Sequence, residues 1–222
     1  MTRLLELWDR FQQKRIVNIV RPFTLVGPER MQNLFRLARR IERERVPGDV
    51  IECGVCNGGT AAILASSATH SPLDRTVWLL DSFQGMPQTT SQDGAGVDGH
   101  AAEEHIGKEV GDLARVKEVL RLIRAEMSRV RIVPGWFQET FPSVSGAISK
   151  IALLNIDADW YESVKLCLET FYDRVVPGGF ISLDDYGHWP GCRLAVDEFF
   201  QRRQLAYKLQ EVDYTARWFR KE

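Results

Sequence analysis

Short apolar runs alternate along the chain with stretches in which apolar residues recur every three or four positions. The apolar runs predict strands, and they lie at 49–52, 76–81, 130–133, 151–157 and 180–185. The periodic stretches predict helices; the first begins at Glu29, and the others lie at 61–68, 113–127, 164–175 and 195–203. Two closing stretches, 207–212 and 214–220, are expected to form an antiparallel strand pair at the sheet edge.

Strands that are apolar throughout and alternate with helices are typical of a parallel sheet covered on both faces. We therefore expect a single-domain α/β fold with a doubly wound, mostly parallel sheet over residues 29–222. Residues 1–28 contain Pro22 and Pro28, which interrupt any long helix, and are expected to form an N-terminal arm. Residues 88–111 are glycine-rich with little periodicity, and an irregular segment of this length predicts a lid over a functional site.

The composition limits the classes of protein that fit. The chain has 222 residues and a net charge of −1, so it lacks the global basic charge that nucleic-acid-binding proteins usually carry. Its longest apolar runs are too short for a membrane helix, and residues 1–15 lack the apolar core of a signal peptide. We expect a cytoplasmic protein that binds neither nucleic acid nor membrane.

Acidic residues follow four of the predicted strands. They are Glu52, Asp81, Asp157 and the pair Asp184 and Asp185. In a parallel sheet the carboxyl ends of the strands meet at one edge, where ligands bind. We therefore expect these acids to line one site, although an aspartate at a strand end is also a common helix cap or turn former.

The glycine-rich turn after the first strand is the first candidate binding element. It runs from Glu52 to Thr60 and contains Gly54, Gly58 and Gly59, which allow a backbone to approach a ligand closely. Neither G-x-G-x-x-G nor a G-K-[ST] ending is present, so NAD and ATP are disfavoured. The turn suits a cofactor with an amino-acid end, such as S-adenosylmethionine; the alternative is a plain tight turn.

The second candidate element is Asp81, which lies about 20 residues beyond the glycine turn. At this position an acid accepts hydrogen bonds from the two ribose hydroxyls of a nucleoside. The alternative is that Asp81 caps the turn at Ser82 and Phe83. Three aromatic residues have two interpretations: they would flank an adenine or a substrate, or they would pack in the core. They are Trp136, Phe137 and Trp160.

Three aspartates from two later strands predict a metal site. Asp157, Asp184 and Asp185 would repel one another unless a proton or a cation neutralised them, and an oxygen-only ligand set indicates Mg²⁺. Such an ion beside a methyl donor would bind a substrate hydroxyl, lower its pKa and hold it in line with the methyl carbon. Asp159 is either a fourth acid or a turn residue, and His188 is a base, a substrate contact or a surface residue.

Cys53 and Cys56 form a C-x-x-C motif, which alone would suggest zinc or a redox dithiol. The other two cysteines, Cys167 and Cys192, stand alone rather than as a second motif. The surrounding glycines give a better account of the segment.

Taken together, these motifs resemble the macrocin O-methyltransferase family, which methylates sugar hydroxyls on macrolides, aminocoumarins and related natural products. The matching segments lie at 48–55 with Gly58 and Gly59, at 80–87, 133–140 and 157–163, and from 178 to 197. Two departures are Cys53 and Cys56, where a small residue and an aromatic are typical, and a short N-terminal region, so acceptor recognition and subunit packing carry over less directly.

The resemblance implies a class I, Rossmann-like methyltransferase fold in a homo-oligomer that acts on a glycosylated natural product. It implies S-adenosylmethionine as donor, Mg²⁺ held by Asp157, Asp184 and Asp185, and Asp157 as the general base or beside it. His188, which closely follows Asp185 in the sequence, is the other candidate for the base. The donor-binding residues would include Glu52 and Gly54 at the methionine end and Asp81 at the ribose. The full set is Glu52, Gly54, Gly58, Gly59, Thr60, Asp81, Ser82, Asp157 and, along the adenine, Gly135, Trp136, Phe137 and Gln138.

Two alternatives remain beside this hypothesis. A metal-independent methyltransferase of the same fold would work in EDTA, and a non-catalytic module would bind a nucleoside without turnover. A dehydrogenase is disfavoured because G-x-G-x-x-G is missing. The sequence does not identify the acceptor.

Overall fold

The computed structural model describes residues 2–69 and 71–222. Within these residues, seven strands form one sheet in the order β3-β2-β1-β4-β5-β7-β6. The first five strands run parallel, and β7 is antiparallel to both β5 and β6. Their bounds are β1 Asp49–Cys53, β2 Val77–Asp81, β3 Val130–Pro134, β4 Ile151–Ile156, β5 Val175–Leu183, β6 Gln210–Glu211 and β7 Arg217–Arg220. The predicted parallel sheet with an antiparallel C-terminal pair is confirmed.

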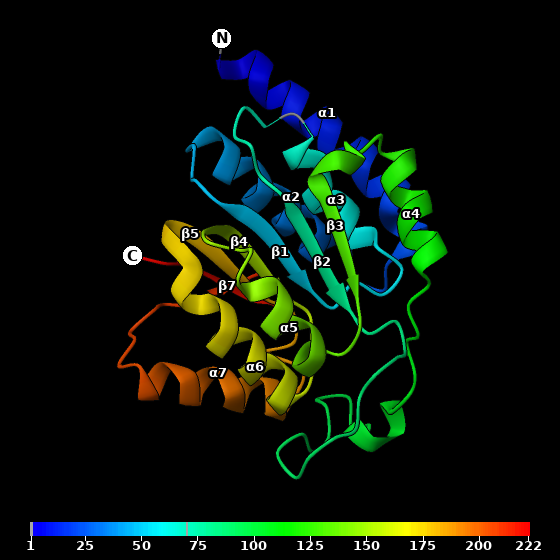
Figure 1. Cartoon of the computed structure of the whole chain (residues 1–222), viewed down its shortest axis with the longest axis vertical. Coiled ribbons are helices and arrows are strands. Elements are labelled where there is room, and N and C mark those ends of the chain that lie inside the picture. Colours follow the sequence, from blue (N-terminus) through cyan, green and yellow to red (C-terminus); the bar gives the residue numbers. More distant parts are fainter. Residues whose placement is uncertain (1, 70) are drawn as a thin grey trace.

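Helices cover both faces of the sheet (Figure 1). One face is covered by α2 (Pro28–Arg43), α3 (Gly59–Ala68) and α4 (Leu113–Leu122), and α1 (Thr2–Val20) packs against these three helices. The other packs against α5 (Phe137–Ser145), α6 (Tyr161–Phe171) and α7 (Pro190–Arg202). Side chains alternate along each strand, so Val50 enters the first core and Ile51 the second. This explains why the strands are apolar throughout. Short 3₁₀ helices lie at Arg21–Phe23, Ala102–His105, Met127–Arg129 and Tyr172–Arg174.

The strand order reverses direction between β1 and β4, which is where doubly wound sheets bind ligands. The chain segments that leave these two strands approach each other closely. Gly54 has φ +89°, and a Cβ at this position would overlap the carbonyl oxygen of Asp157. Only glycine fits there, and the sheet itself imposes this requirement.

The predicted helix over 164–175 is wrong at its C-terminal end. α6 ends at Phe171, and Val175 already pairs with Ile151 as the first residue of β5. The ladder between β4 and β5 is irregular at this point, so Pro177 sits in a strand without breaking a continuous set of hydrogen bonds. The Pro-Gly-Gly segment therefore lies inside a strand and does not terminate a helix.

Three further differences concern helices. The predicted helix over 113–127 ends at Leu122, and Arg124 takes a positive φ of 60°. Helix α5, which contains Pro142, was not predicted. The arm at residues 1–28 contains a 19-residue helix that ends before Pro22. In the described part of the chain, no helix combines the length and the apolar character needed to cross a membrane.

Candidate active site

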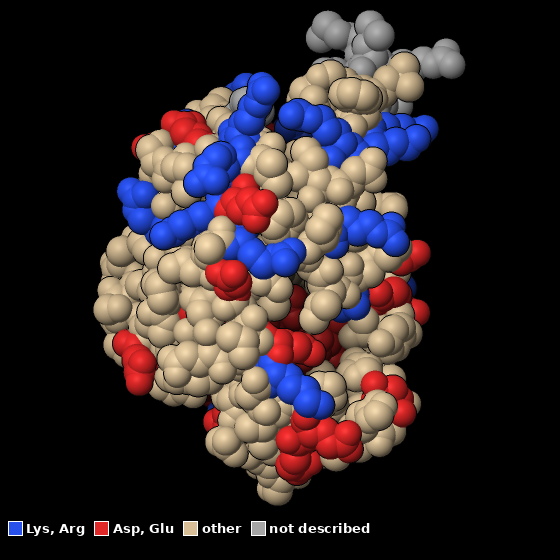
Figure 2. Space-filling view, turned by 90° about the vertical axis from the view of Figure 1, so that its right-hand side faces the viewer, with Lys and Arg blue, Asp and Glu red and all other residues tan. Residues whose placement is uncertain are grey.

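A cavity of about 280 Å³ opens at the carboxyl ends of the parallel strands. Figure 2 shows Asp and Glu side chains in a hollow of one face, whereas Lys and Arg gather toward the upper part of the molecule. The wall combines residues 23–26 before α2 with residues from the glycine turn, the strand ends, the lid and the turn between β6 and β7. The polar and aromatic residues among them include Thr24, Arg30, Thr60, Asp81, Ser82, His105, Glu109, Trp136, Phe137, Gln138, Asp157, Asp159, Asp184, Asp185, His188, Trp189, Tyr214 and Thr215.

Three of the predicted acids meet at this edge. Asp157, Asp184 and Asp185 each offer a carboxylate oxygen, and these oxygens lie within 4.8 Å of one another. The register explains this placement, because Asp157 donates its backbone N–H to Cys53 and Asp184 donates its own to Ile156, both at 2.9 Å. The strand ends are therefore level. No other group of three or more potential ligand side chains was found in the described residues.

Burial and mutual repulsion set the electrostatics of this triad. Burial, followed by the charges of Asp184 and Asp185, raises the pKa of Asp157 well above its ordinary value. Burial also raises the pKa of Asp185, with Asp159 and Asp184 adding to it. Carboxylates in such surroundings favour a proton or a bound cation. The triad therefore fits a hard divalent ion, as its oxygen-only donor set requires.

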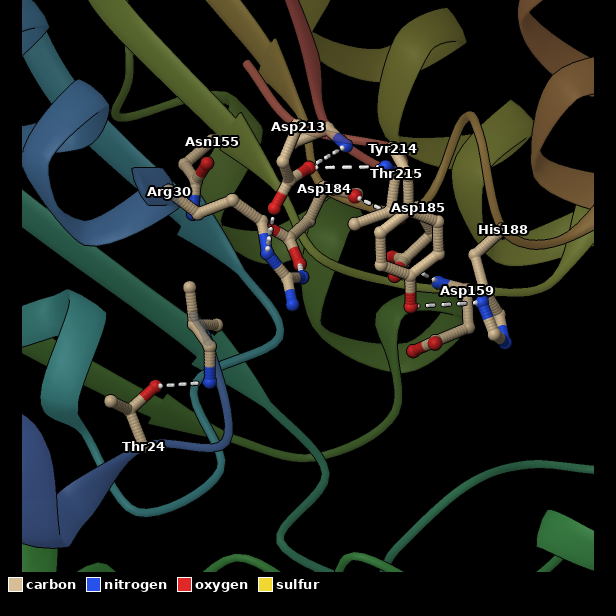
Figure 3. Close-up of polar contacts among 12 residues, drawn as sticks. Thr24, Arg30, Asn155, Asp159, Asp184, Asp185, His188, Asp213, Tyr214 and Thr215 are labelled. Atoms are coloured by element: carbon tan, nitrogen blue, oxygen red, sulfur yellow. Dashed lines mark hydrogen bonds and ion pairs between the residues drawn. The ribbon is translucent and has the colours of Figure 1, made fainter. Parts of the chain in front are cut away.

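Arg30 reaches the triad from the first turn of α2 (Figure 3). Its Nη1 donates to Asp184 Oδ2, and its Nε lies 3.2 Å from Asp213 Oδ2 in the turn between β6 and β7. Burial raises the pKa of Asp184, and the guanidinium opposes this rise. Arg30 was not among the predicted site residues. It shares its helix with several surface arginines, and its partners lie far along the chain.

His188 and Asp159 also lie on the wall. The backbone N–H of Asp159 donates to Asp185 Oδ2 at 3.3 Å, and its Oδ1 accepts from Trp189 Nε1 at 3.0 Å. With φ +53° it is a turn residue as well as a wall residue. The His188 ring lies 3.4 Å from the Tyr214 hydroxyl and 3.8 Å from Asp98 Oδ2. A role for His188 as base or substrate contact stays a prediction.

Asp81 organises the glycine turn. Its Oδ2 accepts from the backbone N–H groups of Val55 and Cys56, at 2.6 and 2.8 Å, and its Oδ1 accepts from Phe83 N–H at 2.7 Å. The capping alternative for the Ser82–Phe83 turn is thus confirmed. Oδ2 thus uses both of its lone pairs, whereas Oδ1 keeps one, so a contact with a ribose hydroxyl remains open to Asp81 through Oδ1.

The other predicted donor-binding residues divide between the wall and the layer behind it. Gly54, Thr60 and Ser82 line the cavity. Gly58 caps α3 with φ +86°, and a Cβ on Gly59 would come within 2.6 Å of the Thr24 side chain. These two glycines are explained by the packing of the turn.

Glu52 is fully buried behind the turn. Its Oε1 accepts from Asn155 Nδ2 at 3.0 Å, and Oε2 is buried with no partner. Burial raises the pKa of Glu52 to about 8. A neutral carboxyl in this position can donate a proton to a hydrogen bond, which an ionised one cannot.

The segment after β3 forms another part of the wall. Trp136, Phe137 and Gln138 line the cavity, and Phe137 stacks on Phe141 with ring centroids 4.7 Å apart. Gly135 makes the preceding turn with φ +136°. Trp160 is buried in the core and donates its Nε1–H to the carbonyl of Pro87 at 3.2 Å.

The two cysteines of the C-x-x-C motif lie in different surroundings. Cys53 is buried in the core next to Cys167, whereas Cys56 lines the cavity with φ 48°. All four cysteines are free. The arrangement therefore gives no support to a shared metal or a dithiol.

The predicted lid at 88–111 has one 3₁₀ turn and two isolated bridges but no longer helix or strand. It projects from one end of the molecule (Figure 1). Asp93 is fully buried, and its Oδ1 accepts from Tyr161 N–H at 2.7 Å, so it caps the start of α6. Ala102 is buried in the second core. The segment is thus anchored in two places, and its role as a lid stays a prediction.

The comparison with known proteins agrees with this geometry. The family model for macrocin O-methyltransferase (TylF) matches residues 12–221. The chain belongs to the macrocin O-methyltransferase family. It is therefore an O-methyltransferase with a methyltransferase fold.

Relatives within the macrocin O-methyltransferase family act on natural products. The chain is 34% identical over 202 residues to demethyldecarbamoylnovobiocin O-methyltransferase of Streptomyces niveus, covering 86% of this chain and 72% of that protein. It is 35% identical over 203 residues to mycinamicin III 3''-O-methyltransferase of Micromonospora griseorubida, covering 89% and 78%. The solved structure of the O-methyltransferase NovP has a TM-score of 0.80 at 32% identity, covering 90% of this chain and 82% of that one.

Proposed function

We propose that this protein transfers a methyl group from S-adenosylmethionine to a sugar hydroxyl of a glycosylated natural product, with Mg²⁺ held by the aspartate triad. The observation that carries the proposal is the position of the triad. Three carboxylates within 4.8 Å of one another lie in the same cavity as the glycine turn. The site therefore has one region suited to a cation and an adjoining region suited to a nucleoside.

The donor half of the proposal rests on the wall of the cavity. Gly54 and Thr60 would face the methionine end, Asp81 the ribose, and Trp136 to Gln138 the adenine. These groups follow β1, β2 and β3, which are neighbours in the sheet, so they form one continuous surface. A solved methyltransferase of similar fold was determined with S-adenosylhomocysteine bound, at a TM-score of 0.58 and 13% identity.

The metal half of the proposal rests on the three carboxylates that would serve as metal ligands. Asp157, Asp184 and Asp185 would hold Mg²⁺, which when bound lowers the pKa of a substrate hydroxyl and fixes the position of its oxygen. The backbone of Asp157 contacts Gly54, so Asp157 adjoins the region proposed to bind the methyl donor. We assign to Asp157 the acceptance of the hydroxyl proton, with His188 as the second candidate.

The acceptor half rests on the part of the wall beyond the triad. His105, His188, Trp189 and Tyr214 gather there, and the ring of Trp189 makes edge contacts with both histidines. Aromatic rings supply large contact areas with polar edges, which suits an acceptor that carries both a sugar and an apolar skeleton. The named activities of the relatives support the same acceptor class.

The test is turnover of S-adenosylmethionine with a panel of glycosylated natural products, followed by mass spectrometry. We expect methylation that stops in EDTA and returns with Mg²⁺. Asp157→Asn should lower the turnover rate by about 10²–10⁴-fold, because a general base and a ligand are lost together. Asp173→Asn, at an exposed site paired with Arg203, serves as the control.

Each alternative predicts a different result in this assay. Turnover that survives EDTA would favour a metal-independent enzyme. Donor binding without turnover on the whole panel would favour a binding module. If Asp157→Asn keeps the wild-type rate at saturating Mg²⁺, Asp157 is a ligand only and His188 becomes the base.

A further inference from the structure

The charge on the cavity wall is strongly unbalanced. Arg30 is the only arginine or lysine among the described residues that line the cavity. Six acids share the wall with it, namely Asp81, Glu109, Asp157, Asp159, Asp184 and Asp185. The guanidinium contacts the aspartate triad, where a divalent cation would also bind.

Arg30 is held between two acids, but its contacts with them are unequal. Nη1 donates to Asp184 Oδ2, a group of the triad. Nε lies 3.2 Å from Asp213 Oδ2, yet it is buried and makes no hydrogen bond. The guanidinium is thus oriented toward Asp184, and its interaction with Asp213 is an ion pair without a directed bond.

Asp213 itself is fixed in place. Its Oδ1 accepts from the backbone N–H groups of Thr215 and Ala216, at 3.0 and 2.8 Å, so Oδ2 remains available to Arg30. The Thr215 hydroxyl donates to the carbonyl of Asp184 at 2.8 Å, which joins this turn to the triad. Figure 3 shows Arg30 between Asp184 and Asp213. A rotation of the Arg30 side chain would replace its hydrogen bond to Asp184 with one to Asp213.

We propose that Arg30 is a resident counter-ion, which occupies Asp184 while the metal is absent and moves onto Asp213 when a divalent cation binds. This inference rests on the proposed metal site. A guanidinium and a dication repel each other at short range, and they compete for the same carboxylate. The charge-assisted hydrogen bond lost at Asp184 is replaced by one at Asp213, where Nε now has no partner.

The metal affinity follows from this competition. Arg30 stabilises the metal-free triad more than the metal-loaded one, so by thermodynamic linkage its removal must strengthen metal binding by the same factor. Asp213 has the opposite effect, since it stabilises the position to which Arg30 withdraws. Replacing Asp213 should therefore weaken metal binding when Arg30 is present. It should have no such effect when Arg30 has been replaced by an uncharged residue.

The experiment titrates the full-length, metal-stripped protein with Mn²⁺ and measures free Mn²⁺ by electron paramagnetic resonance. We expect Arg30→Gln to bind Mn²⁺ about fivefold or more tightly than wild type. Arg30→Lys, which keeps the charge, should stay near wild type. Arg36→Gln is the matched control, because Arg36 lies in the same helix as Arg30 but is exposed and away from the cavity wall.

Asp213→Asn keeps the turn acceptor Oδ1 and tests the second position. We expect weaker Mn²⁺ binding in this variant, and we expect that weakening to disappear in the Arg30→Gln background. An equal weakening in both backgrounds would show loss of negative charge alone and overturn the exchange. If Arg30→Gln does not fold, Arg30→Met, which also removes the charge but keeps an unbranched side chain, takes its place in both titrations.

The outcomes separate this inference from the proposed function. If wild type binds Mn²⁺ and Arg30→Gln binds it equally or more weakly, the metal site stands and the counter-ion role is wrong. If Arg30→Gln binds Mn²⁺ where wild type does not, the competition is supported in its strongest form. If no protein in the series binds Mn²⁺, the metal site itself fails, and the counter-ion role fails with it.

Discussion

Glu52 offers a direct test of the electrostatics beneath the site. Its carboxyl is fully buried, one oxygen has no partner, and its pKa is about 8 instead of the ordinary 4.5. The folded state therefore holds a proton that the unfolded chain releases above pH 4.5. Binding of this proton stabilises the folded state. The stabilisation is fully present below pH 4.5 and is lost as the pH rises toward 8.

The size of the effect follows from these two pKa values. Linkage through the shift from 4.5 to about 8 predicts that Glu52 lowers the free energy of unfolding by about 3 kcal/mol between pH 5.5 and pH 8.5. Glu52→Gln has the same shape but cannot ionise. Its amide leaves a buried N–H without a partner, which costs about 1–3 kcal/mol at every pH. The variant should therefore be less stable than wild type in acid and lose this disadvantage in base.

Urea unfolding of both proteins at several pH values, in EDTA, measures this difference. Other buried acids of the site contribute to both proteins, so subtracting one curve from the other isolates Glu52. Glu118→Gln, at an exposed position of α4, is the control and should give a flat difference. A flat difference for Glu52→Gln as well would mean that Glu52 is ionised in the fold, and the argument from its burial would be refuted.

Three other substitutions test separate contacts. Gly54→Ala places a methyl group against the Asp157 carbonyl oxygen and should lower stability by at least about 3 kcal/mol in thermal unfolding; Gly146→Ala, which points into open space, is the control. Asp93→Ala removes the cap of α6 and should cost about 1–2 kcal/mol, with faster amide exchange in the lid; unchanged exchange would mean that the cap does not anchor it. Asp81→Ala should weaken S-adenosylmethionine binding by about 1.5–3 kcal/mol in calorimetry, and an unchanged affinity would remove Asp81 from the donor site.

Features that depend on local pattern could be predicted from the sequence. The parallel strands were recognised because both of their faces are buried, and the meeting of Asp157, Asp184 and Asp185 followed from the level ends of such strands. The end of α6 was misjudged because Val175 continues the helical spacing of apolar residues. Its pairing with Ile151 in the sheet determines its conformation.

Features that depend on distant partners could not be predicted. Arg30 and Asp184 are separated by 154 positions, and the sequence around Arg30 is that of an ordinary amphipathic helix. Tyr214 lies in a short turn whose position follows from the Thr215 hydrogen bond to the Asp184 carbonyl. No periodicity encodes such contacts, because they arise only when α2, the end of β5 and the turn between β6 and β7 are assembled.

The lid contains a smaller loop, residues 95–101, which is closed by its own backbone hydrogen bonds. Ala102 N–H donates to the Gly94 carbonyl, and Gly96 N–H donates to the His100 carbonyl, both at 2.9 Å, so the loop between them has a closed neck. Its tip carries the exposed Val97 and Asp98, which reaches toward His188. Val97 N–H also donates to the His188 carbonyl at 3.2 Å, so the tip is attached to His188 as well as to its own neck. A change of length or sequence at this tip would therefore act on the position of His188, although residues 95–101 themselves lie outside the cavity wall.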